Sequence, residues 1–92
     1  MAYRITEKQL EAVCDLINRE TNSPIAPYAR IDSKLVAQIG NYHISHAYGG
    51  VCLHRMSNEH GGVSDVFTCG HSPKRELFER MHAYLAGMRD AA

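Results

Sequence analysis

The sequence predicts an α+β fold with the element order αββββα, in which an antiparallel four-stranded sheet has two helices packed on one face. Three features predict this fold. An amphipathic segment with a helix-start motif lies near the N-terminus, short apolar segments alternate with glycine-containing turns between residues 35 and 69, and a second amphipathic segment follows Ser72-Pro73. The 92 residues are enough for one hydrophobic core, so we expect a single domain covering residues 1–92.

The first helix is predicted from residues 5–10, which carry a complete helix-start motif. Thr6 is the expected N-cap, and the Gln9 side chain is expected to return its hydrogen bond. Apolar residues then recur at the spacing of one helix face: Leu10, Val13, Cys14 and Ile17. We expect the helix to begin at Glu7 and to end near residues 21–22, because the prolines that follow force extended backbone.

The predicted sheet follows residues 22–34, which contain two prolines and no periodicity and are expected to be irregular. Gly49-Gly50 is expected to form a hairpin turn, because glycine adopts the positive φ angles that such turns need. The turn would pair Tyr48 with Val51 and place one row of side chains on the face away from the helices: His43, Cys52, His54 and Met56. Four strands are predicted: Leu35–Ile39, Tyr42–Tyr48, Val51–Ser57 and Val63–Cys69.

The second helix is predicted to open at Ser72-Pro73, with serine as the cap and proline at the first helical position. Its apolar stripe is broad: Leu77, Phe78, Met81, Tyr84, Leu85 and Met88. Packing this stripe and that of the first helix on one sheet face would bury both.

Charge and cysteine content limit the classes of function. Ten basic residues balance ten acidic ones, so the formal net charge is 0 and no direct DNA binding is expected. The three cysteines form no even set for a disulfide framework, and we expect reduced thiols. The sequence shows no export signal and no apolar run that could span a membrane, which predicts a soluble protein of the cytoplasm.

Six histidines raise the question of a metal. His43, Cys52 and His54 would share one sheet face, but no paired spacing typical of a zinc site is present. We therefore expect no metal and no cofactor, with a metal-binding protein as an open alternative. His43 and His54 are expected to face solvent, and His46 is expected to be partly buried with a hydrogen-bond partner.

A cysteine nucleophile with a histidine base is the enzymatic hypothesis, since Cys52 lies near His54 and Cys69 lies near His71 in the sequence. Activation needs a lowered thiol pKa, an orienting third group and oxyanion donors. None of these can be assigned from the sequence. We expect no catalytic residue and no enzymatic activity.

Lys74 and Arg75 fall in the first turn of the second helix, where the helix dipole disfavours positive charge. A partner surface or a phosphate group could explain their position. With Arg55 and the two sheet histidines they give the predicted partner-binding residues: His43, His54, Arg55, Lys74 and Arg75. A small-ligand or nucleic-acid-binding module at the start of this helix is the alternative.

Three segments of the chain resemble known proteins. These segments are Gly40-Asn41-Tyr42-His43 through Ala47-Tyr48-Gly49-Gly50, residues 62–66 and residues 70–85. They resemble small accessory proteins of tailed phages and prophages of Gram-negative bacteria. The resemblance covers about residues 5–88 and implies no individual site residue. Some phage proteins of this size are anti-CRISPR inhibitors.

The resemblance therefore implies inhibition of a bacterial defence system, above all a CRISPR-Cas effector complex, in the cytoplasm of the bacterial host. The expected partner is a host protein or ribonucleoprotein defence complex. A neutral chain is a poor mimic of DNA, so we expect stoichiometric protein–protein blockade by a monomer or homodimer.

Overall fold

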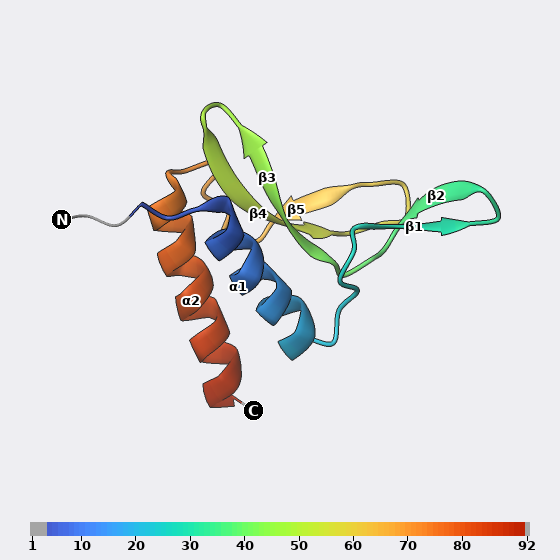
Figure 1. Ribbon diagram of the computed structural model, residues 1–92. Coiled ribbons are helices and arrows are strands. Elements are labelled where there is room, and N and C mark those ends of the chain that lie inside the picture. Colours follow the sequence, from blue (N-terminus) through green and yellow to red (C-terminus); the bar gives the residue numbers. More distant parts are fainter. Residues whose placement is uncertain (1–3, 92) are drawn as a thin grey trace.

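The computed structural model describes residues 4–91, which form two helices and two small antiparallel sheets (Figure 1). The α+β class is therefore confirmed. Along the chain the elements are α1 (Glu7–Glu20), β1 (Tyr28–Ile31), β2 (Lys34–Ala37), β3 (Tyr42–Ala47), β4 (Gly50–Met56), β5 (Val63–Asp65) and α2 (Lys74–Ala91). No helix in the described range 4–91 has the length and apolar character needed to cross a membrane.

Helix α1 begins as the sequence predicts. The Thr6 hydroxyl accepts a hydrogen bond from the Gln9 backbone N–H at 3.2 Å, and the Gln9 side chain accepts one from the Thr6 N–H at 2.8 Å. These bonds satisfy backbone donors that a helix start leaves without partners. The helix ends at Glu20, with Thr21 as its C-cap.

Both helices pack on one face of the sheet formed by β3, β4 and β5 (Figure 1). The predicted helix stripes supply one side of the core, and alternate residues of β3 and β4 supply the other. The buried cluster consists of Leu10, Val13, Cys14, Ile17, Tyr42, Val51, Leu53, Leu77, Met81 and Leu85.

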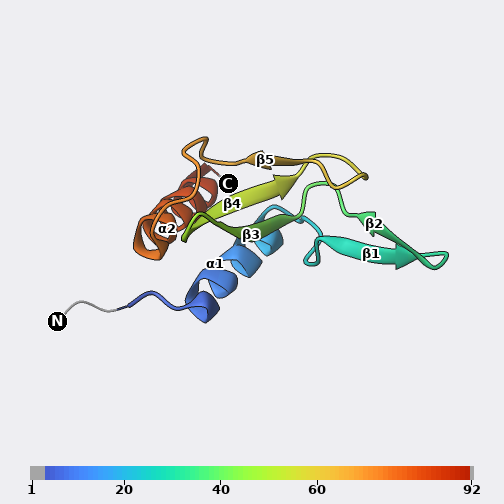
Figure 2. The same cartoon turned by 90° about the horizontal axis from the view of Figure 1, so that it is seen from above.

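The expected single sheet of four strands is wrong. Residues 34–37 do form a strand, but β2 pairs with β1, which lies in the segment expected to be irregular. The two strands are joined by Asp32 and Ser33, whose φ angles of 50° and 66° give a turn that matches the twist of a hairpin. Together they form an arm that extends away from the helices (Figures 1 and 2).

The β3–β4 turn also differs from the expected one. It is formed by Tyr48 and Gly49, with φ angles of 54° and 73°, and His46 rather than Tyr48 pairs with Val51. Gly50 belongs to β4, where it pairs with Ala47, and a side chain there would collide with Ser72, because a Cβ at Gly50 would lie 2.9 Å from the Ser72 carbonyl oxygen. The register is shifted by two residues, so each side chain keeps its predicted face.

Strand β5 stops at Asp65, and the second half of the expected strand Val63–Cys69 is wrong. The Asp65 carboxylate accepts hydrogen bonds from the backbone N–H groups of Phe67 (3.1 Å), Thr68 (3.0 Å) and Gly70 (2.7 Å). These bonds curl the chain into a turn, since an aspartate side chain competes with the sheet for backbone donors. The Val66 N–H still donates to the Leu53 carbonyl of β4 at 3.0 Å, and after the turn the chain returns to β4 where Ser72 bridges Val51.

Asn18 connects α1 to the first residue of β3. Its side-chain amide donates to the Tyr42 carbonyl at 3.0 Å, and its Oδ1 accepts from the Tyr42 N–H at 2.8 Å. Asn18 is only 1% exposed, so these bonds replace those that a neighbouring strand would make. On the other side, the Tyr42 hydroxyl lies 2.9 Å from that of Tyr84 in α2.

Replacing Asn18 by alanine is expected to lower the free energy of unfolding by about 1–3 kcal/mol, because it leaves the buried Tyr42 N–H without a partner. Urea denaturation measures the change. Arg19→Ala, at the next, exposed position of α1, is the control and should change stability by less than about 0.5 kcal/mol. Equal stabilities for the two variants would contradict the structural role of Asn18.

Candidate interaction site

Three imidazole rings lie in a row on the sheet face opposite the helices. The centroids of His43 and His54 are 5.9 Å apart, those of His54 and His71 are 6.0 Å apart, and the Tyr48 ring lies 5.7 Å from His71. We call His43, His54 and His71 the histidine row. The structure thus brings two predicted partner-binding residues together and adds His71, which comes from the loop before α2.

Hydrogen bonds orient two rings of the row. The Asn41 amide nitrogen donates to the Pro24 carbonyl at 2.8 Å, so its Oδ1 faces His43 as an acceptor. His43 therefore carries its proton on Nδ1, 3.1 Å from Oδ1, and leaves Nε2 with a lone pair. At the other end, His71 Nε2 lies 3.1 Å from the Ser45 hydroxyl.

His43 and His54 lie on the sheet face away from the helices, as expected, and the row is half-buried there. Burial lowers the pKa of His43 below the usual 6.5, and the neighbouring His54 lowers it further. Burial also lowers the pKa of His54; the charge of Asp65 opposes this shift, and His71 adds to it. Both rings are thus predominantly neutral at neutral pH. In the described chain, no group of three or more His, Cys, Asp or Glu side chains is arranged to hold a metal ion.

The expected open face does not include Cys52 and Met56, which are both 2% exposed. The Asp65 turn lies beside Cys52, and its carboxylate interacts with the thiol. Burial and this interaction raise the pKa of the Cys52 thiol to about 12, so it is protonated at neutral pH.

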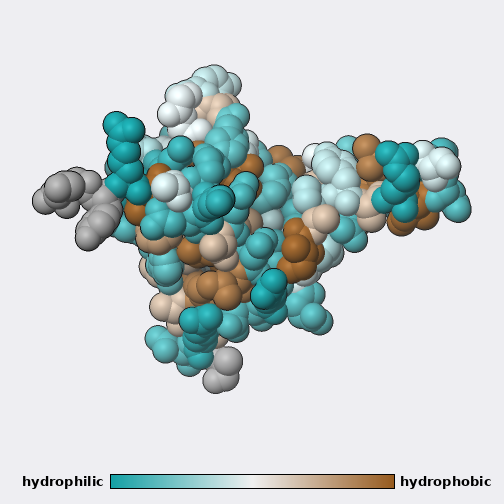
Figure 3. All heavy atoms as spheres, viewed as in Figure 1, coloured by the Kyte–Doolittle hydropathy of each residue, from teal (hydrophilic) through white to brown (hydrophobic). Residues whose placement is uncertain are grey.

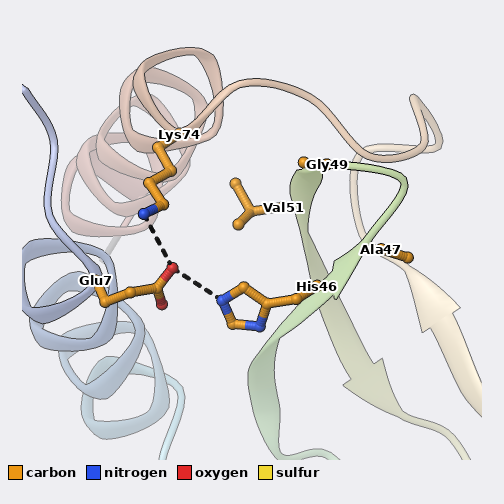
Figure 4. Close-up of a pocket in the computed structure, with 7 residues that line it drawn as sticks. Glu7, His46, Ala47, Gly49, Val51 and Lys74 are labelled. Carbon is orange, nitrogen blue, oxygen red and sulfur yellow. Dashed lines mark hydrogen bonds and ion pairs between the residues drawn. The ribbon is translucent and has the colours of Figure 1, made fainter.

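Lys74 lies beside a pocket where the starts of both helices meet the β3–β4 hairpin (Figure 4). Glu7 Oε1 accepts a hydrogen bond from His46 Nε2 at 2.9 Å and lies 3.4 Å from Lys74 Nζ. This ion pair offsets the unfavourable position of Lys74 in the first helical turn. His46 has the hydrogen-bond partner expected of it, but its side chain is 55% exposed rather than partly buried.

The five predicted residues do not form one surface. Arg55 lies on the helix side of the sheet, with its guanidinium 4.9 Å from the centre of the Tyr42 ring and its Nε 3.3 Å from the Gly40 carbonyl. Arg75 is exposed in the first turn of α2. The set is therefore divided between the histidine row, the helix starts and the edge of the core.

The arm, defined as residues 25–39, is the largest feature that the sequence interpretation missed. It has large apolar side chains with high exposed fractions: Ile25 (51%), Tyr28 (47%), Ile31 (55%), Leu35 (64%) and Ile39 (61%). Figure 3 shows hydrophobic surface interspersed with hydrophilic surface along the arm. A signal was present in the alternating Tyr28–Ile31 segment followed by Asp32-Ser33, although the turn contains no glycine.

Hydrogen bonds fix the base of the arm. The Gln38 N–H donates to the Pro27 carbonyl at 2.8 Å, and the Gln38 side chain donates to the Ala26 carbonyl at 2.8 Å. The Ala37 N–H donates to the Glu59 carbonyl in the β4–β5 loop at 3.3 Å. The Gln38 bonds thus join the two ends of the arm to each other, and the Ala37 bond joins the arm to the β4–β5 loop.

No known family model, curated protein or solved structure matches the chain.

Replacing Glu7 by glutamine is expected to destabilise the protein in a pH-dependent way. The hydrogen bond from His46 lowers the Glu7 pKa below the usual 4.5, and Lys74 contributes to the shift. The stabilising contribution is therefore complete above pH 4.5 and is lost as the pH falls through the lower pKa of the folded state. For so exposed a carboxylate we expect a loss on the order of 0.5 kcal/mol at neutral pH.

Urea denaturation of the wild type and Glu7→Gln over a pH series measures this contribution. Glu76→Gln is the control, because Glu76 pairs with Arg80 within a single helix at 3.9 Å. A difference between wild type and Glu7→Gln that persists unchanged at pH values well below 4.5 would contradict the assigned ion pair.

Proposed function

We propose that the protein is a non-catalytic binding protein that acts by stoichiometric protein–protein contact, with the arm as its main contact element. The observation that supports this proposal is the exposure of five large apolar side chains, between 47% and 64%, on an arm anchored at its base. Exposed apolar groups concentrated on one element are typical of interaction sites. A fixed arm also loses little conformational entropy on binding.

The proposed target is a bacterial defence complex, above all a CRISPR-Cas effector complex in the cytoplasm of the bacterial host. The resemblance to small phage proteins supports this choice of target. The arm combines apolar residues with Arg30, Asp32 and Lys34, a mixed composition that suits a subunit interface better than mimicry of DNA. Binding there would block assembly or substrate access without any chemical step.

The alternative is an anionic ligand or nucleic acid at the start of α2. Lys74 is already paired with Glu7 at 3.4 Å, so such a ligand would compete with an internal carboxylate. The other predicted partner-binding residues, His43, His54, Arg55 and Arg75, remain proposed secondary contacts. The arm supports a protein partner more directly.

Titration of purified CRISPR effector complexes from Gram-negative hosts with this protein tests the proposal, using target-DNA cleavage and co-elution as readouts. For the sensitive complex, inhibition is expected to be complete at a fixed molar ratio. The double variant Ile31→Ser/Leu35→Ser should bind roughly tenfold or more weakly, since it removes two apolar anchors and each tenfold change is about 1.4 kcal/mol.

Leu16→Ser is the matched control, because Leu16 is a 39% exposed leucine on α1 outside the arm. This variant is expected to inhibit like the wild type. Failure of the wild type to inhibit any effector complex would overturn the proposed target. Inhibition by Ile31→Ser/Leu35→Ser as strong as that of the wild type would overturn the assignment of the arm as the contact element.

A further inference from the structure

The two long edges of the arm differ in their hydrogen-bonding groups. The bond from the Gln38 N–H to the Pro27 carbonyl makes these residues a hydrogen-bonded pair of the antiparallel ladder. Because such pairs alternate along the ladder, Ala29 and Ile31 direct their backbone groups toward β2. Tyr28 and Arg30 therefore direct their N–H and C=O groups outward.

The outer edge of β1 is the open one. β2 is the only strand that pairs with β1 within residues 4–91, and Figure 2 shows β1 on the outer side of the arm. The corresponding edge of β2 is partly occupied, because the Ala37 N–H donates to the Glu59 carbonyl. An open edge offers a ready template for another strand.

Side chains on β1 define what kind of strand fits. Tyr28 and Arg30 lie on one face of the arm, and Ala29 and Ile31 lie on the other, because neighbouring residues of a strand alternate. The Arg30 guanidinium makes a long contact from Nη1 to the Ser33 carbonyl, at 3.5 Å. An added strand would therefore gain most from acidic side chains on the Arg30 face and apolar side chains on the Ile31 face.

We propose that the outer edge of β1 binds an extended segment of the partner protein by strand addition, and that this segment alternates acidic and apolar residues. The proposal rests on the proposed function, since it specifies how the arm holds its partner. Backbone bonds to Tyr28 and Arg30 supply affinity, and alternate side chains supply specificity. A second copy of the chain fits less well, because β1 contains no acidic residue to face Arg30.

A short capped peptide of alternating valine and glutamate is the probe, and its valine–lysine counterpart is the control peptide. Fluorescence anisotropy with the full chain at neutral pH measures binding. The valine–glutamate peptide is expected to bind roughly tenfold or more tightly than the control, because like charges opposite Arg30 are unfavourable. Equal affinities for the two peptides would overturn the proposal.

Two substitutions at one position separate backbone pairing from side-chain charge. Arg30→Pro removes the outward N–H but no bond to β2, since Arg30 and Leu35 form a non-hydrogen-bonded pair. Arg30→Thr removes the charge and keeps the N–H. We expect the proline variant to lose peptide binding and the threonine variant to be weakened by less.

Circular dichroism and urea denaturation establish that both variants fold. If Arg30→Pro binds the peptide as tightly as the wild type, strand addition is wrong. It is also wrong if the two variants lose the same amount of peptide affinity, because the effect would then come from the side chain alone. Reversible dimerisation of the wild type that Arg30→Pro abolishes would identify a second copy as the occupant and overturn an acidic partner.

The effector-complex assay distinguishes failure of this inference from failure of the proposed function. If Arg30→Pro still inhibits while Ile31→Ser/Leu35→Ser does not, the arm binds its partner through side chains only and strand addition is wrong. If the peptide binds as expected but no effector complex is inhibited, strand addition stands and the proposed defence target is wrong.

Discussion

The buried side chain of Asn18 holds the backbone of Tyr42, and the positions of both helices and of the arm depend on that contact. The Asn18 amide pairs with both the N–H and the carbonyl of Tyr42, at 2.8 and 3.0 Å, as a neighbouring strand would. This pairing fixes where β3 begins on α1, and the 2.9 Å contact between the hydroxyls of Tyr42 and Tyr84 extends the connection to α2. A buried polar contact of this kind is costly to break, because the Tyr42 N–H would lose its partner and the Tyr42 carbonyl would keep only the weaker bond from the Cys14 thiol, at 3.2 Å.

The direction of the arm depends on the residue that precedes Tyr42 in the chain, Asn41. Asn41 is fully buried, and its amide donates to the Pro24 carbonyl while its Oδ1 faces His43. Its backbone N–H donates to the Gln38 carbonyl, so both ends of the arm are held close to the start of β3. The same asparagine thus orients one end of the histidine row and the base of the arm, which places two candidate contact surfaces on one rigid framework.

Local signals predicted the helices, and contacts between distant segments decided what the sequence interpretation missed. The Thr6–Gln9 motif and the apolar stripes are short-range patterns, and both helices form where these patterns lie. Gly50 was expected in the turn because glycine favours turns, whereas it lies in β4, where the close approach of Ser72 leaves no room for a side chain. His43 and His54 lie on the same sheet face as predicted, because the expected β3–β4 register differs from the observed one by two residues and an even shift keeps each side chain on its face. The sequence showed that Lys74 places a positive charge in the first turn of a helix, where it is unfavourable. Its partner Glu7 lies in the other helix and could be identified only from the structure, which brings the two helix starts together.

The central claim is that the arm is the main contact element of the protein. Hydrogen exchange of the arm, measured with and without a bound effector complex, tests this claim most directly. Backbone amides of Tyr28 and Arg30 point outward and should exchange readily in the free protein, because they have no strand beside them in the described chain. Mass spectrometry after binding to an inhibited effector complex is expected to show slowed exchange in residues 25–39, with little change on the exposed face of α1. Unchanged exchange in the arm, together with protection at the helix starts or the histidine row, would contradict the account.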